Sequence, residues 1–179
     1  LECVVFGAQL GKISIKPQSI DSLPINPAPI EIPGLDLWGE RIIQTSELWI
    51  DRVHAIREEL PRLMWQAAGI CREQNSLETA INRVKFLQVE FNNLPISQLI
   101  SQLLPLQAVI LPTEISERDF CTWGETRNLL DIGLSILTGA LMRTESRGGH
   151  YRTDFPTIDP TWQVHTIVHR DRWFKSDSI

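Results

Sequence analysis

The sequence has few cysteines, no excess of positive charge and no long apolar run. Its three cysteines form no Cys-x-x-Cys pair, which argues against a disulfide framework or a zinc ribbon and favours buried, reduced thiols in a cytoplasmic protein. The net charge of −5 at pH 7 argues against a nucleic-acid partner. No apolar run approaches the roughly 20 residues of a membrane helix, so we expect no membrane partner.

The sequence also lacks an initiator methionine. Its first residues, Leu1–Phe6, resemble the middle of an apolar secondary-structure element. We therefore expect the 179 residues to be a fragment or a processed product of a longer protein. The hydrophobic content of 42% and the charged content of 22% are ordinary values for a folded domain.

Charged and titratable side chains are unevenly distributed. Residues 143–179 carry six basic and five acidic side chains, and three of the four histidines. The preceding 142 residues carry 11 basic and 17 acidic side chains. Side chains suited to chemistry or recognition are thus concentrated at the C-terminal end.

Apolar periodicity predicts three long helices. Five prolines between residues 17 and 33 exclude a helix there and predict an extended linker over residues 12–45. A helical stripe begins after Ser46 and continues to about Arg72, with Pro61 either kinking one helix or starting another. The stripe consists of Trp49, Val53, Ile56 and Leu60, followed by Leu63, Met64, Ala67, Ala68 and Cys71.

The second and third helices have clearer start signals. Asn75 and Glu78 resemble a capping box, and Ser116 with Asp119 brackets a helix that we expect over residues 117–144. Residues 94–117 read as an irregular insertion with one short helix over residues 97–104. The second helix carries the most regular stripe of the chain, formed by Leu77, Ala80, Ile81, Val84, Leu87 and Phe91.

Helices with one apolar stripe each can bury those stripes only against one another. We therefore predict an all-α fold, an antiparallel three-helix bundle with an extended proline-rich N-terminal arm and an irregular C-terminal tail. Trp49, Trp65 and Trp123 lie on the apolar stripes and are predicted to be core residues, with Trp65 as an anchor.

The tail contains a specific motif. The sequence from Arg143 to Pro156, which includes Glu-Ser-Arg-Gly-Gly-His-Tyr-Arg, resembles the signature that closes the last helix in the succinate dehydrogenase/fumarate reductase flavoprotein family. Its His-Tyr-Arg form most resembles the L-aspartate oxidase branch. Leu1-Glu2-Cys3 resembles the end of the motif that closes the flavin-binding domain in this family. Weaker matches run through all three helices, with Met64-Trp65, Gly69-Ile70 and Arg72 in the first, Leu77, Ala80, Arg83, Leu87 and Glu90 in the second, and Glu125–Leu129 in the third.

The resemblance implies four regions. Residues 1–11 would be a remnant of the flavin-binding domain and residues 12–45 a linker. Residues 46–144 would form the helical bundle with insertion 94–117, and residues 145–179 a docking tail. The parent would use FAD to oxidise L-aspartate to iminoaspartate in quinolinate and NAD biosynthesis, with its catalytic and flavin-contacting residues before Leu1. We therefore expect no catalytic, cofactor-binding or metal-binding residue in this chain, whose main partner would be its own flavin-binding domain.

Two other interpretations remain. The chain could come from a succinate dehydrogenase or fumarate reductase flavoprotein, although that branch usually has Ala at the position of Tyr151. It could also be a free-standing helical interaction module, which the apolar start at Leu1 argues against.

We expect the polar residues of the tail to dock the bundle onto the flavin-binding domain. They are Glu145, Arg147, His150, Arg152 and Asp154. For Glu145 and Arg147 the simpler alternative is an ion pair or a helix-end cap, and for His150 proton transfer competes with a structural role. His165 and His169 have the spacing of metal ligands on a helix, but no acidic or cysteine partner accompanies them. The pattern Arg170, Arg172 and Trp173 is read as a solvated terminus rather than a nucleic-acid surface.

Overall fold

The computed structural model describes residues 46–102, 115–169 and 172–176. The predicted flavin-domain remnant, the proline-rich linker, most of the insertion and Cys3 lie outside these residues. The helices are α3 (Ser46–Ala68), α4 (Gln74–Asn92), α5 (Pro95–Ser101) and α6 (Glu117–Met142). The strands are β1 (Cys71–Arg72), β2 (Tyr151–Arg152), β3 (Thr166–His169) and β4 (Arg172–Lys175), with one 3-10 turn, η2, at Pro160–Trp162.

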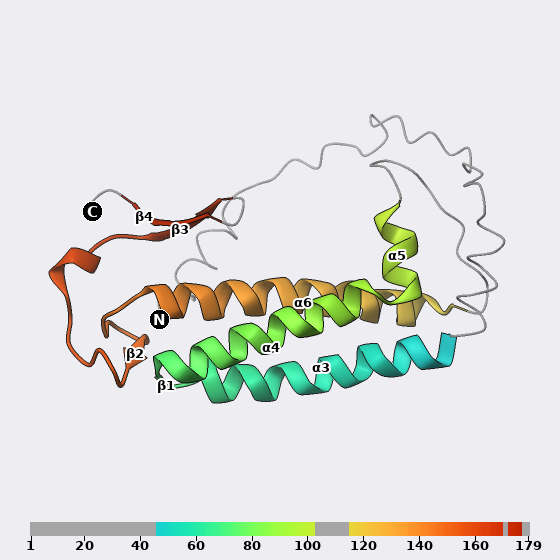
Figure 1. Ribbon diagram of the computed structural model, residues 1–179, viewed down its shortest axis with the longest axis horizontal. Coiled ribbons are helices and arrows are strands. Elements are labelled where there is room, and N and C mark those ends of the chain that lie inside the picture. Colours follow the sequence, from blue (N-terminus) through green and yellow to red (C-terminus); the bar gives the residue numbers. More distant parts are fainter. Residues whose placement is uncertain (1–45, 103–114, 170–171, 177–179) are drawn as a thin grey trace, which may run out of the picture.

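Three long helices lie side by side and form the body of the described structure (Figure 1). Helices α3 and α6 run in the same direction, and α4 runs between their ends in the opposite direction. The side chains between them form one hydrophobic core, to which α5 adds Ile96 and Leu99 at one end. The fold is therefore mostly helical, as predicted, but the short strands show that "all-α" was too simple.

Helix α4 confirms the apolar stripe read from the sequence, since all six predicted residues are buried. Its predicted start was wrong. The helix begins at Gln74, and Asn75 is an exposed residue inside it. The side chain of the N-cap residue Glu73 accepts a hydrogen bond from the Ser76 hydroxyl but none from a backbone N–H of the first turn. The capping acceptor comes instead from the tail, where a carboxylate oxygen of Asp154 accepts a hydrogen bond from the Gln74 N–H at 3.0 Å.

Helix α6 starts as the sequence predicts. Ser116 is its N-cap, and the Ser116 hydroxyl accepts a hydrogen bond from the Asp119 N–H at 3.1 Å. The helix ends at Met142, two residues earlier than expected. Gly133 lets α3 approach closely, because a Cβ at this position would lie 3.4 Å from the sulfur of Met64.

The sequence left two alternatives for Pro61, a kink within one helix or the start of another. Helix α3 passes through Pro61 without a break, so the structure has one continuous helix. Trp49 and Trp123 are buried core residues, as predicted. Trp65 is not, because its side chain is 70% exposed. The buried stripe of α3 runs through Leu60 to Ala67, and at 100° per residue position 65 points away from it.

The expectation of buried thiols was wrong, because Cys71 and Cys121 are free but exposed. The short helix expected within the insertion is present at Pro95–Ser101, slightly before the predicted range. Within the described part of the chain, no helix is long and apolar enough to cross a membrane.

The tail is more regular than the sequence suggested. Strand β2 pairs in parallel with β1, which joins residues about 80 positions apart, and β3 pairs with β4 as an antiparallel hairpin. The hairpin packs on α6 where Trp173 meets Gly139, since a Cβ on Gly139 would lie 3.3 Å from the indole ring. This contact gives Trp173 a packing role, in place of the solvated terminus expected from the sequence.

Candidate functional site

The tail places its polar side chains against the ends of the three long helices. We call this cluster the polar junction, and it consists of Arg72, Arg143, Glu145, Arg147, His150, Arg152, Asp154 and Asp159. The junction brings together all five residues that the sequence predicted as a site, and adds Arg72, Arg143 and Asp159 as their partners.

Glu145 is a fully buried carboxylate at the centre of the junction, with 0% exposure. It accepts hydrogen bonds from the Arg147 Nε and Nη2 atoms at 2.8 and 3.0 Å, from the Asp159 N–H at 2.9 Å and from the Arg143 guanidinium. The hydrogen bonds from Arg147 dominate over the opposing effect of burial and lower the pKa of Glu145 to about 2. The carboxylate is therefore ionised at neutral pH and fully paired, which makes it unsuited to act as a general base.

Arg152 is 1% exposed and closes the C-terminal end of α6. Its Nη1 donates to the carbonyl oxygens of Ala140 and Leu141 at 2.9 and 3.1 Å, groups that the helix itself leaves without partners. The other edge of the guanidinium binds Asp154 through two hydrogen bonds of 2.7 and 2.6 Å. This bidentate pair lowers the pKa of Asp154 to about 2.

Asp154 joins two helices through this arrangement. One carboxylate oxygen accepts from Gln74 at the start of α4, while the same side chain holds the arginine that caps the end of α6. A negative charge at a helix N-terminus and a positive charge at a helix C-terminus both interact favourably with the helix dipoles. One tail residue pair thus fixes the ends of two antiparallel helices.

His150 lies between two polar groups of the junction. Its Nε2 is 3.2 Å from the Arg143 carbonyl oxygen, and its Nδ1 is 3.4 Å from Arg72 Nη1. Burial, followed by the nearby arginine charges, lowers the pKa of His150 despite the opposing effect of the carbonyl. A carbonyl only accepts and a guanidinium only donates, so the neutral ring carries its proton on Nε2. Among the described residues, both ring nitrogens of His150 thus already have a hydrogen-bond partner, which favours a structural role over proton transfer.

A tight turn places these side chains. Arg147 and His150 exchange backbone hydrogen bonds of 2.8 and 3.0 Å around the two intervening glycines. Gly148 has a φ of +57°, in the left-handed region that glycine adopts without strain. The motif therefore uses its first glycine to reverse the chain, so that residues on either side of the turn reach the helix ends.

The histidines near the C-terminus do not form a metal site. His169 ends strand β3 and His165 immediately precedes it, so the two belong to extended backbone and not to a helix face. Four residues of strand span about 13 Å, too far for one metal ion. Among the described residues, no group of three or more metal-ligating side chains is gathered in one place.

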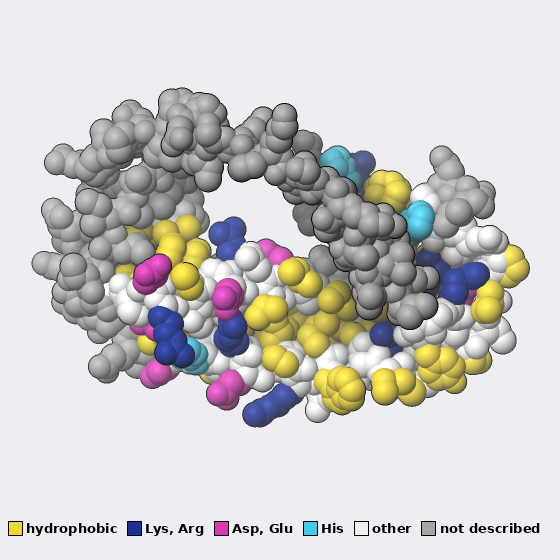
Figure 2. All heavy atoms as spheres, turned by 180° about the vertical axis from the view of Figure 1, so that it is seen from behind, with side chains coloured by type: hydrophobic (Ala, Val, Ile, Leu, Met, Phe, Trp, Pro, Cys, Tyr) yellow, Lys and Arg dark blue, Asp and Glu magenta, His cyan; other side chains and the backbone are white. Residues whose placement is uncertain are grey.

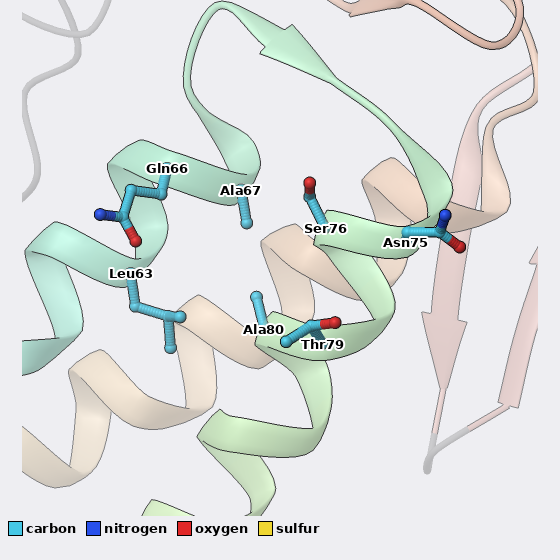
Figure 3. Close-up of a pocket in the computed structure, with 7 residues that line it drawn as sticks. All are labelled: Leu63, Gln66, Ala67, Asn75, Ser76, Thr79 and Ala80. Carbon is cyan, nitrogen blue, oxygen red and sulfur yellow. The ribbon is translucent and has the colours of Figure 1, made fainter.

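Two hollows of the described surface differ in the side chains that line them. A hollow of about 300 Å³ between α3 and α4 has Leu63, Ala67 and Ala80 pointing inward, as Figure 3 shows. None of the seven residues that line it is titratable. A second hollow of about 390 Å³ contains Arg143, Arg147 and His150, but both guanidinium groups are already bound to Glu145.

The glycine pair of the polar junction is not arranged as in a dinucleotide-binding turn. A dinucleotide site places its pyrophosphate on a glycine-rich turn that leads from a strand into a helix. The Gly148-Gly149 turn leads instead into strand β2. The hollow of about 510 Å³ between α3 and α6 is lined by apolar side chains and glycine, and none of its lining residues carries a charge that would bind a phosphate.

Comparison with known proteins supports a family assignment. A family model described as the C-terminal part of fumarate reductase flavoproteins matches residues 109–177. The L-aspartate oxidase of a Nostoc species is 42% identical over 98% of this chain and 29% of its own length. The L-aspartate oxidase of a Synechocystis species is 39% identical over 99% of this chain and 30% of its own length.

A fumarate reductase flavoprotein subunit of Mycobacterium tuberculosis is also similar, at 29% identity over 95% of this chain and 28% of its own length. The chain therefore spans less than a third of the length of these curated relatives. Its matches agree with the tail motif described above, and the matched family range includes the whole polar junction except Arg72. The chain belongs to the succinate dehydrogenase and fumarate reductase flavoprotein family, in which it is similar to the C-terminal region of L-aspartate oxidases.

Proposed function

We propose that the chain is the C-terminal helical domain of an L-aspartate oxidase, in which FAD accepts electrons as L-aspartate is oxidised to iminoaspartate. The observation that carries this proposal is the 42% identity to an L-aspartate oxidase across nearly the whole chain. The similar fumarate reductase subunit reaches only 29% over the same region. Tyr151, in the His-Tyr-Arg form of the motif, favours the same branch.

In this proposal the chain itself performs no chemistry. The buried carboxylate and the buried guanidinium of the polar junction each have partners within the chain, and His150 is held between the Arg143 carbonyl and Arg72. Such groups stabilise a shape rather than react with a substrate. The domain therefore supplies a rigid surface on which the flavin-binding part of the same polypeptide rests.

The five predicted docking residues have different places in this proposal. Glu145 and Arg152 are buried, so they contribute indirectly, by holding the tail in its conformation. Arg147 and Asp154 keep 38% and 28% of their side chains exposed, which leaves them an outer edge for contact with the flavin-binding part. We propose that Arg147 and Asp154 contact the flavin-binding part. The buried Glu145 and Arg152 would hold these two side chains in position.

The experiment uses the full-length protein that contains this chain. We expect it to purify with bound FAD and to release hydrogen peroxide when L-aspartate and oxygen are supplied. Succinate in place of L-aspartate serves as the control, because the fumarate reductase alternative predicts activity with that dicarboxylate. Flavin binding with oxidation of succinate and not of L-aspartate would favour the alternative and contradict the proposal.

A further inference from the structure

We propose that the flavin-binding part of the polypeptide docks on an apolar strip formed by α3 and α6. The strip consists of Pro61, Met64, Trp65, Ile70, Ile132 and Ile136. This inference deepens the proposed function and rests on it, since it names the surface that the missing part of the protein covers. The strip would act together with the polar junction, next to which it lies.

The strip is exposed and continuous. Trp65 and Ile70 are 70% and 72% exposed, and Ile132 and Ile136 are 56% and 50% exposed. Residues of α3 and α6 meet in an open apolar hollow of about 510 Å³, lined by Pro61, Met64, Trp65, Ala68, Gly69, Ile70 and Ile136. Contiguous apolar surface of this kind is typical of an interface, whereas single exposed apolar residues are ordinary.

The other seams between the helices are polar. Helices α3 and α4 are bridged across their outer edge by the ion pairs Arg52–Glu90 and Arg83–Glu59. Helices α4 and α6 are bridged by a hydrogen bond of 2.8 Å between Gln88 and Asp131. Among the described residues, the seam between α3 and α6 has one ion pair, Arg57–Glu125, which lies near the middle of α3.

Figure 2 shows a difference along the bundle on one face of the molecule, with the end nearer the tail at the right. Hydrophobic side chains gather over the middle and the right of the view, and most visible acidic side chains lie in its left half. Two of the three seams, α3–α4 and α4–α6, therefore carry polar side chains that suit contact with water. The seam between α3 and α6 exposes apolar side chains, and covering them with another surface is favourable.

The occupant is argued from chain length and from continuity. The chain spans 29% and 30% of the two L-aspartate oxidases, so about 70% of such a protein lies outside it, joined to α3 through the residues that precede Ser46. Tethering of this kind gives the missing part an effective concentration on the order of millimolar. Ile136 also lines the hollow that contains Arg72 and His150, so the strip runs directly into the polar junction.

The first test is side-chain footprinting of the full-length protein with hydroxyl radicals. The labelling rate of each residue in the native protein is divided by its rate in the unfolded protein. We expect Trp65 to be protected as strongly as the buried Trp123, while Phe86 on α4, which is 53% exposed, stays close to its unfolded rate. Labelling of Trp65 as free as that of Phe86 would overturn the proposal.

Two variants of nearly equal exposure provide the matched comparison. Ile132→Glu places a charge in the strip, and Val89→Glu places the same charge on α4, where the side chain is 59% exposed. We expect loss of Trp65 protection in the first variant and unchanged protection in the second. Unchanged protection in both variants, or equal loss in both, contradicts docking through the strip.

A photo-cross-linking residue at position 132 identifies the occupant. Cross-links to residues that precede Leu1 support the proposal, and cross-links to residues 12–45 or to a second copy of the chain overturn it. Flavin content and L-aspartate oxidation are measured on the same sample. An inactive protein with Trp65 protected refutes the proposed function alone, and an active protein with Trp65 exposed refutes the docking surface alone.

Discussion

Replacing Glu145 by Gln removes the one negative charge at the centre of the polar junction. The side chain has 0% exposure, and its charge holds Arg143 and Arg147 together. The pKa of Glu145 is about 2, compared with 4.5 for a free glutamate, and at about 1.36 kcal/mol per pKa unit this difference corresponds to about 3 kcal/mol. We expect Glu145→Gln to lower the free energy of unfolding of the 179-residue chain by about that amount.

Urea unfolding followed by circular dichroism measures this loss. The control is Glu125→Gln, which makes the same chemical change in an ion pair whose glutamate is 61% exposed, and which should cost less than about 1 kcal/mol. Equal losses for the two variants would refute the reasoning, because burial would then have no bearing on the energy of the pair.

The same carboxylate predicts a pH dependence. Its pKa is lower in the folded chain than in the unfolded chain, so its stabilisation is fully present above pH 4.5 and is lost as the pH falls toward about 2. The stability difference between the unsubstituted chain and Glu145→Gln should therefore shrink over this range. A difference that stays constant from pH 5 to pH 2 would show that the charge of Glu145 is not what stabilises the junction.

Five further substitutions test the polar junction, the packing and the turn. Asp154→Ala should cost about 3–5 kcal/mol in urea unfolding, because it leaves a buried arginine without its carboxylate. Trp65→Ala should change the stability of the 179-residue chain by less than about 0.5 kcal/mol, since its side chain is exposed, whereas Trp123→Ala should cost about 3–5 kcal/mol. Gly148→Ala should lower the thermal midpoint through about 1–2 kcal/mol of backbone strain, and Gly149→Ala, which is equally free of steric contact but has no positive φ, should lower it less.

Local patterns predicted the helices well. The stripe from Leu77 to Phe91 is buried at every expected position, and the Ser116 cap starts α6 as read. These features depend on residues within one or two turns of each other, so they can be predicted from the local sequence. Trp65 was wrongly assigned to the core. An aromatic residue beside an apolar stripe can be placed inside or outside the core only when the rotation of the helix is known to within one residue.

Long-range partners were beyond the reach of local patterns. The start of α4 is capped by Asp154, 80 residues further along the chain, and not by the nearby Asn75. Strand β1 exists only because β2 pairs with it, again about 80 positions away. The five tail residues lie together in the structure, while their role in docking stays a prediction. Arg72 and Arg143 were quoted only for the family resemblance, because nothing in the local spacing marks them as partners of these residues.

We propose above that the chain is a noncatalytic part of a flavin-dependent L-aspartate oxidase. The most direct measurement compares the full-length protein with the 179-residue chain, recording the flavin absorption band and the rate of peroxide release with L-aspartate in both. We predict both signals in the full-length protein and neither in the chain alone. A chain that binds flavin, or a flavin-loaded full-length protein that releases no peroxide with L-aspartate, would contradict the account.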